Sequence, residues 1–147
     1  MLKRNFLMLS LVLILSGCAT YATGPLFMEA PPSPDKKSTL YIFRAKTIEM
    51  GTPKVKINGK PFVDLKAMGY SYAYLPPGIY RISFDYGAFA GGGFITEVEM
   101  KEGKDLYVLY SGNGMVNNVV EMTKEQASEQ IKNYRYVDPI NNDFKSP

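Results

Sequence analysis

The only cysteine of the chain, Cys18, is the residue whose chemistry is most clearly indicated by its surroundings. It follows a basic amino-terminal patch, an apolar run over residues 6–15 and the small pair Ser16-Gly17. A basic start, an apolar run and small residues at a cleavage point are the parts of a secretory signal. The run has ten residues, whereas spanning a bilayer takes about 20. We therefore expect the segment to be removed rather than to remain as a membrane anchor.

The tetrad Leu15-Ser16-Gly17-Cys18 resembles the lipobox of bacterial lipoproteins. The resemblance implies that the Cys18 thiol is joined to diacylglycerol, that the chain is cut between Gly17 and Cys18, and that the new amine is acylated by a fatty acid such as palmitate. About two acyl chains give stable anchoring, so such a protein would stay at the membrane. Ala19 stands where an aspartate favours the inner membrane, which implies the outer membrane, facing the periplasm. The alternative is an ordinary secretory signal that contains a cysteine.

Composition limits the chemistry of the remaining chain. Histidine is absent, which removes the most common general base and zinc ligand, and acylation of Cys18 would leave no thiol for a disulfide. Lys3 and Arg4 leave with the signal, so 15 of the 17 basic residues face 14 acidic ones and the net charge falls from +3 to +1. We expect no nucleic acid partner, no metal, no cofactor and no enzymatic activity.

Two other groups of residues resemble catalytic or binding motifs. The glycine-rich stretch 87–93 would cradle a phosphate only ahead of a helix, but a strand pattern follows it, so a hairpin loop is the better interpretation.

Glu97 and Glu99 point the same way on the strand that follows this loop. Glycosidases need two carboxyls flanking a cleft, typically from separate elements, so we interpret this pair as a solvated face.

The row Tyr70, Tyr72 and Tyr74 is the one candidate binding surface. The three side chains share a face if residues 69–75 form a strand, because the side-chain period of a strand is two. Amphipathic aromatic rings on one face can stack against a glycan or a protein partner. We favour the alternative that the tyrosines face inward and pack beneath the terminal helix, although Leu75 of the opposite set could equally point inward.

The rest of the sequence predicts one small domain on a proline-rich linker. Proline-rich chain extends by about 3.1 Å per residue, so the linker could hold the domain up to about 60 Å from the bilayer. The alternative is that it lies folded along the domain, docked through Leu26, Phe27 and Met28. The expected divisions are a signal at 1–17, the acylated cysteine and linker at 18–38, a β-sandwich at 39–137 and a loose tail at 138–147.

The domain is expected to be mainly β, a single antiparallel β-sandwich of seven or eight strands. The segment 39–45 is apolar on both faces, as in a central strand of a covered sheet. Asn58-Gly59 predicts a type I′ hairpin turn, and Pro61 favours an edge position for its strand. The strand segments are 39–45, 54–58, 60–65, 69–75, 79–86, 94–100, 105–111 and 116–122.

One C-terminal helix is expected to close the domain. Thr123 and Gln126 have the spacing of a capping box, which satisfies backbone amides at a helix start. Ala127, Ile131 and Tyr134 form an apolar stripe that can lie on a sheet.

In the hairpin of segments 79–86 and 94–100, the apolar residues of both strands must lie on the same face of the sheet, so the residue numbers of each cross-strand pair must add up to an even number. We expect the register in which the two numbers of each pair add up to 180. The pairs are Ile82–Val98, Tyr80–Met100 and Phe84–Thr96 inside, with Arg81–Glu99 outside.

After the lipobox and the linker, a series of turn and strand motifs resembles a family of small bacterial envelope lipoproteins known only as a domain of unknown function. The likeness covers residues 39–134, and more loosely it extends to short β-sandwich modules with Asn/Asp-Gly-Lys and Pro-Gly motifs. It implies an anchored sandwich and no catalytic residues. The motifs are Tyr41-Ile42-Phe43-Arg44, Ile57-Asn58-Gly59-Lys60, Leu75-Pro76-Pro77-Gly78-Ile79-Tyr80 and Glu102-Gly103-Lys104 before Leu106-Tyr107-Val108.

Two functions of different class follow from the sequence. The first, which we prefer, is a non-enzymatic envelope lipoprotein that binds or scaffolds an envelope protein or the cell wall. The second is an accessory or inhibitory lipoprotein that acts on a soluble periplasmic enzyme or ligand. Crosslinking would separate them by the class of partner recovered.

Overall fold

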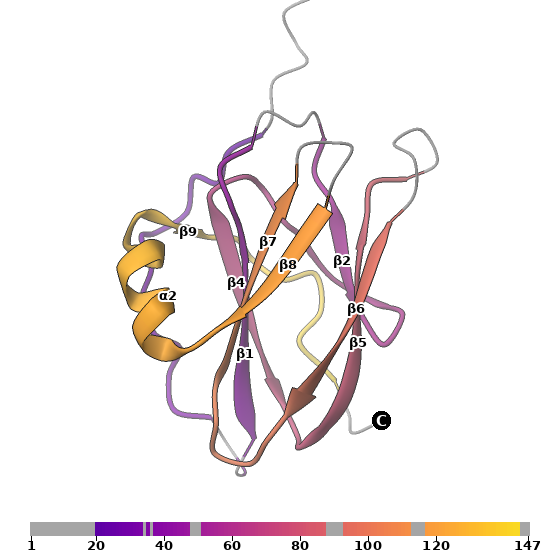
Figure 1. The fold of residues 1–147 in the computed structure, drawn as a ribbon, viewed down its shortest axis with the longest axis vertical. Helices are drawn as coiled ribbons and strands as arrows, with labels where there is room; N and C mark the ends of the chain where they lie inside the picture. The colour runs from indigo at the N-terminus through magenta and orange to yellow at the C-terminus, as the bar shows by residue number, and fades with distance from the viewer. Residues whose placement is uncertain are drawn as a thin grey trace, which may run out of the picture.

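A computed structural model describes residues 20–33, 35, 37–47, 51–87, 93–112 and 117–144 (Figure 1). In these residues the chain forms two packed β-sheets and one short C-terminal helix, which confirms the predicted sandwich. The strands are β1 (Ser38–Arg44), β2 (Lys54–Ile57), β3 (Lys60–Asp64), β4 (Gly69–Leu75), β5 (Gly78–Asp85), β6 (Phe94–Met100), β7 (Leu106–Gly112), β8 (Asn117–Met122) and β9 (Arg135–Tyr136). The helix α2 (Lys124–Gln130) and the 3₁₀ turn η3 (Ile131–Asn133) lie between β8 and β9.

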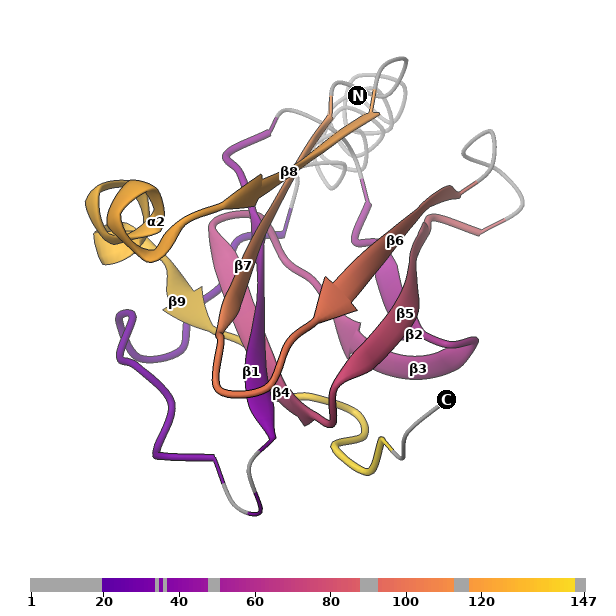
Figure 2. The same ribbon diagram turned by 60° about the horizontal axis from the view of Figure 1, so that its bottom comes forward.

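The two sheets have the strand orders β8-β7-β1-β4-β9 and β3-β2-β5-β6 (Figure 2). Two pairs, β1–β7 and β4–β9, are parallel, and the other pairs among the described residues are antiparallel. The sandwich is therefore mixed rather than purely antiparallel. The alternation of apolar and polar residues predicts strands, but it does not say which strand lies beside which.

Strand β1 is central, as its two apolar faces predict, and it is buried along its whole length. Leu40 and Ile42 face the other sheet, where they join the core between the sheets. Tyr41 and Phe43 face away from it into a second cluster. The five-stranded sheet is thus covered on both faces.

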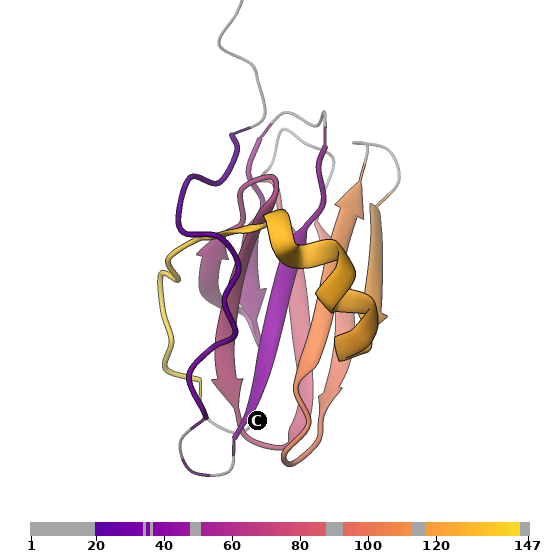
Figure 3. The same ribbon diagram turned by 90° about the vertical axis from the view of Figure 1, so that its left-hand side faces the viewer.

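The second cluster includes residues of α2, η3 and the N-terminal segment 20–33. Figure 3 shows these segments lying over the outer face of the five-stranded sheet. The capping box is confirmed: the Gln126 amide donates to the Thr123 hydroxyl, and the Thr123 amide donates to the Gln126 side chain. The predicted stripe of Ala127, Ile131 and Tyr134 is buried against the sheet.

The hairpin turn and the edge strand also follow the prediction. Asn58 and Gly59 have φ values of 48° and 79°, the left-handed pair that a type I′ turn requires. Strand β3, which carries Pro61, is an edge of the four-stranded sheet.

The register predicted for β5 with β6 is wrong by two residues. Tyr80 pairs with Val98, and Arg81 pairs with Glu97 rather than with Glu99. The predicted facing is nevertheless right, because Ile82 is buried and Arg81 is exposed. A shift of two residues keeps every side chain on its face, so the hydrophobic pattern cannot distinguish the two registers.

The prediction of a loose tail does not hold for residues 138–144. Phe144 is only 5% exposed and its ring meets the edge of Phe62 at 5.7 Å between centroids. The Ile140 amide donates to the Phe62 carbonyl at 2.6 Å. The proline and the two asparagines of this segment suggested a loose tail, but one aromatic side chain, that of Phe144, fills a place in the core between the sheets.

The long axis of the sandwich has two distinct ends (Figures 1 and 3). We call the upper end the Thr20 end, because the described chain starts there, beside Ala67. Strands β1, β5 and β7 end at this end of the sandwich, and strands β2 and β6 begin there. At the lower one, the Pro76 end, lie the connection from β4 to β5 and the turn over residues 101–104.

Candidate functional site

The predicted acylation and cleavage residues, Cys18 and Gly17, lie outside the described residues. The description begins at Thr20, whose carbonyl accepts a hydrogen bond of 3.0 Å from the Ala67 amide. The Ala22 amide in turn donates to the Ala67 carbonyl at 3.0 Å. The chain is therefore already bound to the domain two residues after Cys18.

We call residues 20–33 the docked segment, because they lie along the outer face of the five-stranded sheet (Figure 3). Phe27 enters the second cluster, with its ring 4.9 Å from that of Tyr70 in an edge arrangement. The sequence left open whether this proline-rich stretch is an extended spacer or lies folded along the domain. In the structure, residues 20–33 lie folded along the domain. Phe27 makes the predicted contact, whereas Leu26 and Met28 are exposed.

Tyrosine hydroxyls hold the backbone of the docked segment. The Ala30 amide donates to the Tyr41 hydroxyl at 2.9 Å and the Met28 amide donates to the Tyr70 hydroxyl at 3.2 Å. The Tyr74 hydroxyl donates to the Pro31 carbonyl at 2.8 Å. Each such bond contributes about 1 kcal/mol net. Three tyrosines of the sheet thus act as fixed partners for a segment that has little regular structure of its own.

The tyrosine row of β4 faces away from the core between the sheets, which receives Ala73 and Leu75. Tyr70 is 3% exposed, whereas Tyr72 and Tyr74 are half-buried. The favoured arrangement, in which the row faces inward beneath the terminal helix, is therefore wrong. Tyr70 and Tyr72 pack instead into the second cluster, where the docked segment and β9 cover them.

Of the three tyrosines of the predicted binding surface, Tyr72 and Tyr74 are the two whose rings a partner can reach. The rings of Tyr72 and Tyr74 lie 5.6 Å apart, and Tyr136 of β9 lies 5.7 Å from Tyr72. The sequence pattern does not indicate Tyr136 as part of this surface, because it predicts no strand at residues 135–136. Strand β9 has only two residues, Arg135 and Tyr136, which is too short for an alternating pattern to predict a strand.

Burial also changes the acidity of the tyrosines around the second cluster. It raises the pKa of Tyr107 to about 12, with a further contribution from the Asp105 carboxylate. Burial likewise raises the pKa of Tyr136 to about 12, helped by Tyr72. The pKa of Tyr41 is raised for the same reason, and the Ala30 amide opposes the shift.

These shifts predict a loss of stability at alkaline pH. A tyrosine whose pKa is higher in the folded than in the unfolded protein favours the folded state below about pH 10, the unfolded value, and loses that advantage as the pH rises toward its folded value. We therefore expect the free energy of unfolding to fall between about pH 10 and about pH 12. Urea unfolding across this range measures it, and Tyr107→Phe should make the fall shallower. An unchanged pH dependence in that variant would contradict the assignment.

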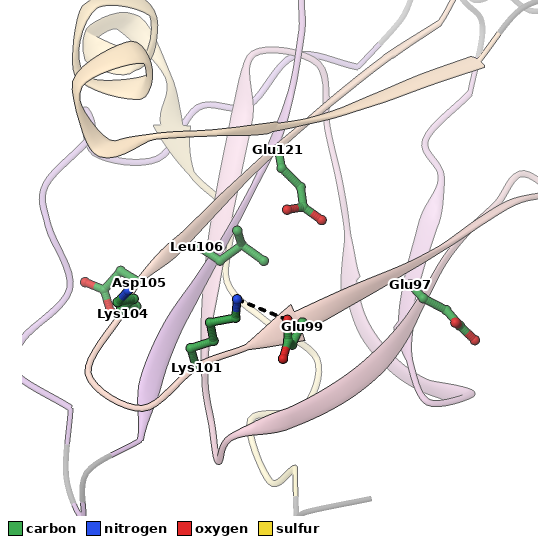
Figure 4. Close-up of a pocket in the computed structure, with 7 residues that line it drawn as sticks. All are labelled: Glu97, Glu99, Lys101, Lys104, Asp105, Leu106 and Glu121. Carbon is green, nitrogen blue, oxygen red and sulfur yellow. Dashed lines mark ion pairs between the residues drawn. The ribbon is translucent and has the colours of Figure 1, made fainter.

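A polar groove lies between β6, an edge strand of the four-stranded sheet, and β8, an edge strand of the five-stranded sheet (Figure 4). Its volume is about 460 Å³. Lys101 Nζ lies 3.2 Å from the Glu99 carboxylate. Figure 4 shows Glu121 reaching into the groove from β8, whereas Glu97 points away from it. The lining residues are Glu97, Glu99, Lys101, Lys104, Asp105, Leu106 and Glu121.

The groove offers charge but no recognisable catalytic pair. Glu99 is exposed and held by Lys101, whereas general acids of hydrolases are carboxyls in apolar surroundings. Within the part of the chain that the structure describes, no three acidic or cysteine side chains are grouped to hold a metal ion. The arrangement suits ionic contacts with a partner.

Arg44 is a buried cation that the sequence analysis did not single out. It ends β1 at the Thr20 end, is 1% exposed, and its Nη1 donates at 3.1 Å to both the Gly51 and the Leu65 carbonyls. Its guanidinium lies 5.7 Å from the centre of the Tyr86 ring. These contacts join both sheets at this end, so we assign Arg44 a structural role.

Comparisons with protein-family models, with curated proteins and with solved structures found no match for this chain. In the described ranges, no helix is both long and apolar enough to cross a membrane.

Proposed function

We propose that the protein is a bacterial envelope lipoprotein, anchored by lipid on Cys18, whose sandwich domain binds or scaffolds other envelope components without catalysis. The observation that carries this proposal is the secretory signal that ends in Leu15-Ser16-Gly17-Cys18. With Ala19 next to the cysteine, the proposed location is the outer membrane, facing the periplasm.

The surfaces of the domain support a binding role. The groove presents exposed charges of both signs, and Tyr72 and Tyr74 present half-buried aromatic rings at a separate place, the outer face of β4. Exposed ion pairs contribute little to stability, so the charged groove is available for recognition. The resemblance to envelope lipoproteins of unknown function agrees with this proposal and adds no reaction.

Cys18→Ala tests the anchor. We expect this variant to lose fatty-acid labelling and to stay uncleaved by the lipoprotein pathway, because no other thiol can accept the diacylglycerol. The matched control is Ser16→Ala, which keeps a small residue in the motif and should be labelled as the unaltered protein is. Fatty-acid labelling that survives Cys18→Ala would overturn the proposal.

Mild crosslinking in intact cells tests the binding role of the same anchored protein. Recovery of an outer-membrane protein or of cell-wall fragments is the expected result. A soluble periplasmic enzyme recovered in its place would contradict the scaffolding role and favour the accessory one.

A further inference from the structure

The distance between the proposed lipid and the domain is set by two residues. Fully extended chain spans about 3.5 Å per residue, so Thr20 lies within about 7 Å of the Cys18 backbone. Thr20 is itself bonded to Ala67 of the domain. The docked segment therefore cannot serve as a long spacer while its contacts persist.

The short tether of residues 18–20 joins the sandwich at one end of its long axis and not at its middle. Ala67 lies between β3 and β4, at the Thr20 end, and the chain of the docked segment runs from there toward the Pro76 end (Figures 1 and 3). An attachment within about 7 Å of one end of an elongated body leaves that end nearest to the membrane.

We propose that the Thr20 end of the sandwich lies against the phospholipid headgroups and that the Pro76 end points into the periplasm. This inference rests on the proposed acylation of Cys18. Its partner is the anionic phospholipid surface into which the acyl chains insert.

The side chains of the Thr20 end suit such a surface. Tyr21 is 44% exposed beside the tether, and tyrosine favours the interface between headgroups and water because it has an apolar ring and a polar tip. Asp85, one of the acids there, is bound to Lys56 at 2.9 Å. Exposed or half-buried basic side chains at this end include Lys46, Lys54, Lys56 and Lys66, and the acidic side chains Asp64 and Asp85 lie there too.

The groove opens between β6 and β8 beside the turn over residues 101–104, away from the Thr20 end, and its lining includes four carboxylates and two lysines. Anionic headgroups attract basic residues within about a Debye length, roughly 10 Å at 0.1 M salt, and repel acidic ones. The orientation rests on the short tether and on Tyr21 beside it.

Two matched cysteine variants of the full lipidated protein test the orientation. Lys46→Cys places a thiol at the Thr20 end and Lys104→Cys places one at the opposite end, both at exposed positions outside strands. Because the Cys18 thiol is consumed by the lipid, each variant carries one free thiol for a fluorescent label. The labelled proteins are reconstituted in vesicles of phosphatidylethanolamine and phosphatidylglycerol that contain headgroup spin-labelled lipid.

We expect quenching to be several-fold stronger at position 46 than at position 104. An insert of about 12 glycine and serine residues before Thr20, which spans roughly 20 Å, should reduce the difference. The same insert after Asp35 leaves the docked segment in place and should not. Equal quenching at the two positions in protein that carries lipid would overturn the orientation alone. Protein without lipid on Cys18 would overturn the proposed function and this inference with it.

Discussion

Replacing Tyr70 by alanine is expected to lower the free energy of unfolding by about 3 kcal/mol or more, the loss typical of large aromatic truncations in cores. Tyr70 is the best-buried member of the tyrosine row, and its ring contacts those of Phe27, Phe43 and Tyr136. Truncation would leave a cavity between the docked segment and the sheet. Equilibrium unfolding in urea measures the change.

The matched control is Tyr74→Ala, on the same face of the same strand. Tyr74 is half-buried and has one hydrogen bond to Pro31, so its loss should cost about 1 kcal/mol. Equal losses at Tyr70 and Tyr74 would contradict the described packing of the second cluster. If Tyr74→Ala keeps its stability but recovers less of the crosslinked partner, the exposed part of the row takes part in binding.

Removing the docked segment should have the second large effect. A chain that begins at Lys37 loses the contacts of Phe27 and the amide donors of Met28 and Ala30. A buried aromatic contributes about 2 kcal/mol and each hydrogen bond about 1, while releasing the segment regains entropy. We expect a net loss on the order of 3 kcal/mol relative to a chain that begins at Thr20.

This expectation differs from the division expected from the sequence, which treats residues 18–38 as a linker outside the sandwich domain. The core between the sheets does lie downstream, so the shorter chain should still give a β-type circular-dichroism spectrum. It should unfold at lower urea and bind more of a dye that reports exposed apolar surface. Equal midpoints for the two chains would show that the docked segment does not stabilise the domain.

The strands, the hairpin at Asn58-Gly59 and the capped helix could be predicted because each depends on a few adjacent residues. Alternation, left-handed turn residues and a capping box are local signals. The register of β5 with β6 and the parallel pairing of β1 with β7 are choices among alternatives that leave every side chain on the same face. Local patterns contain no information that separates such choices.

The covering of the tyrosine row shows the same limit for the candidate site. The pattern of β4 allowed two inward faces, and both are in fact covered, one by the second sheet and one by the docked segment. Proline content indicated an extended linker, and it did not reveal that tyrosine hydroxyls of the sheet would bind its backbone. Phe144 is a similar case, because one apolar residue in a polar tail has no period to reveal its burial.

The central claim of this account is the lipid on Cys18. Mass spectrometry of the intact protein, extracted from bacterial membranes with detergent, tests it most directly. The account predicts a chain that begins at Cys18 and carries the added mass of a diacylglyceryl group and of an amide-linked fatty acid. A chain that begins elsewhere, or one that begins at Cys18 with no added lipid mass, would contradict it.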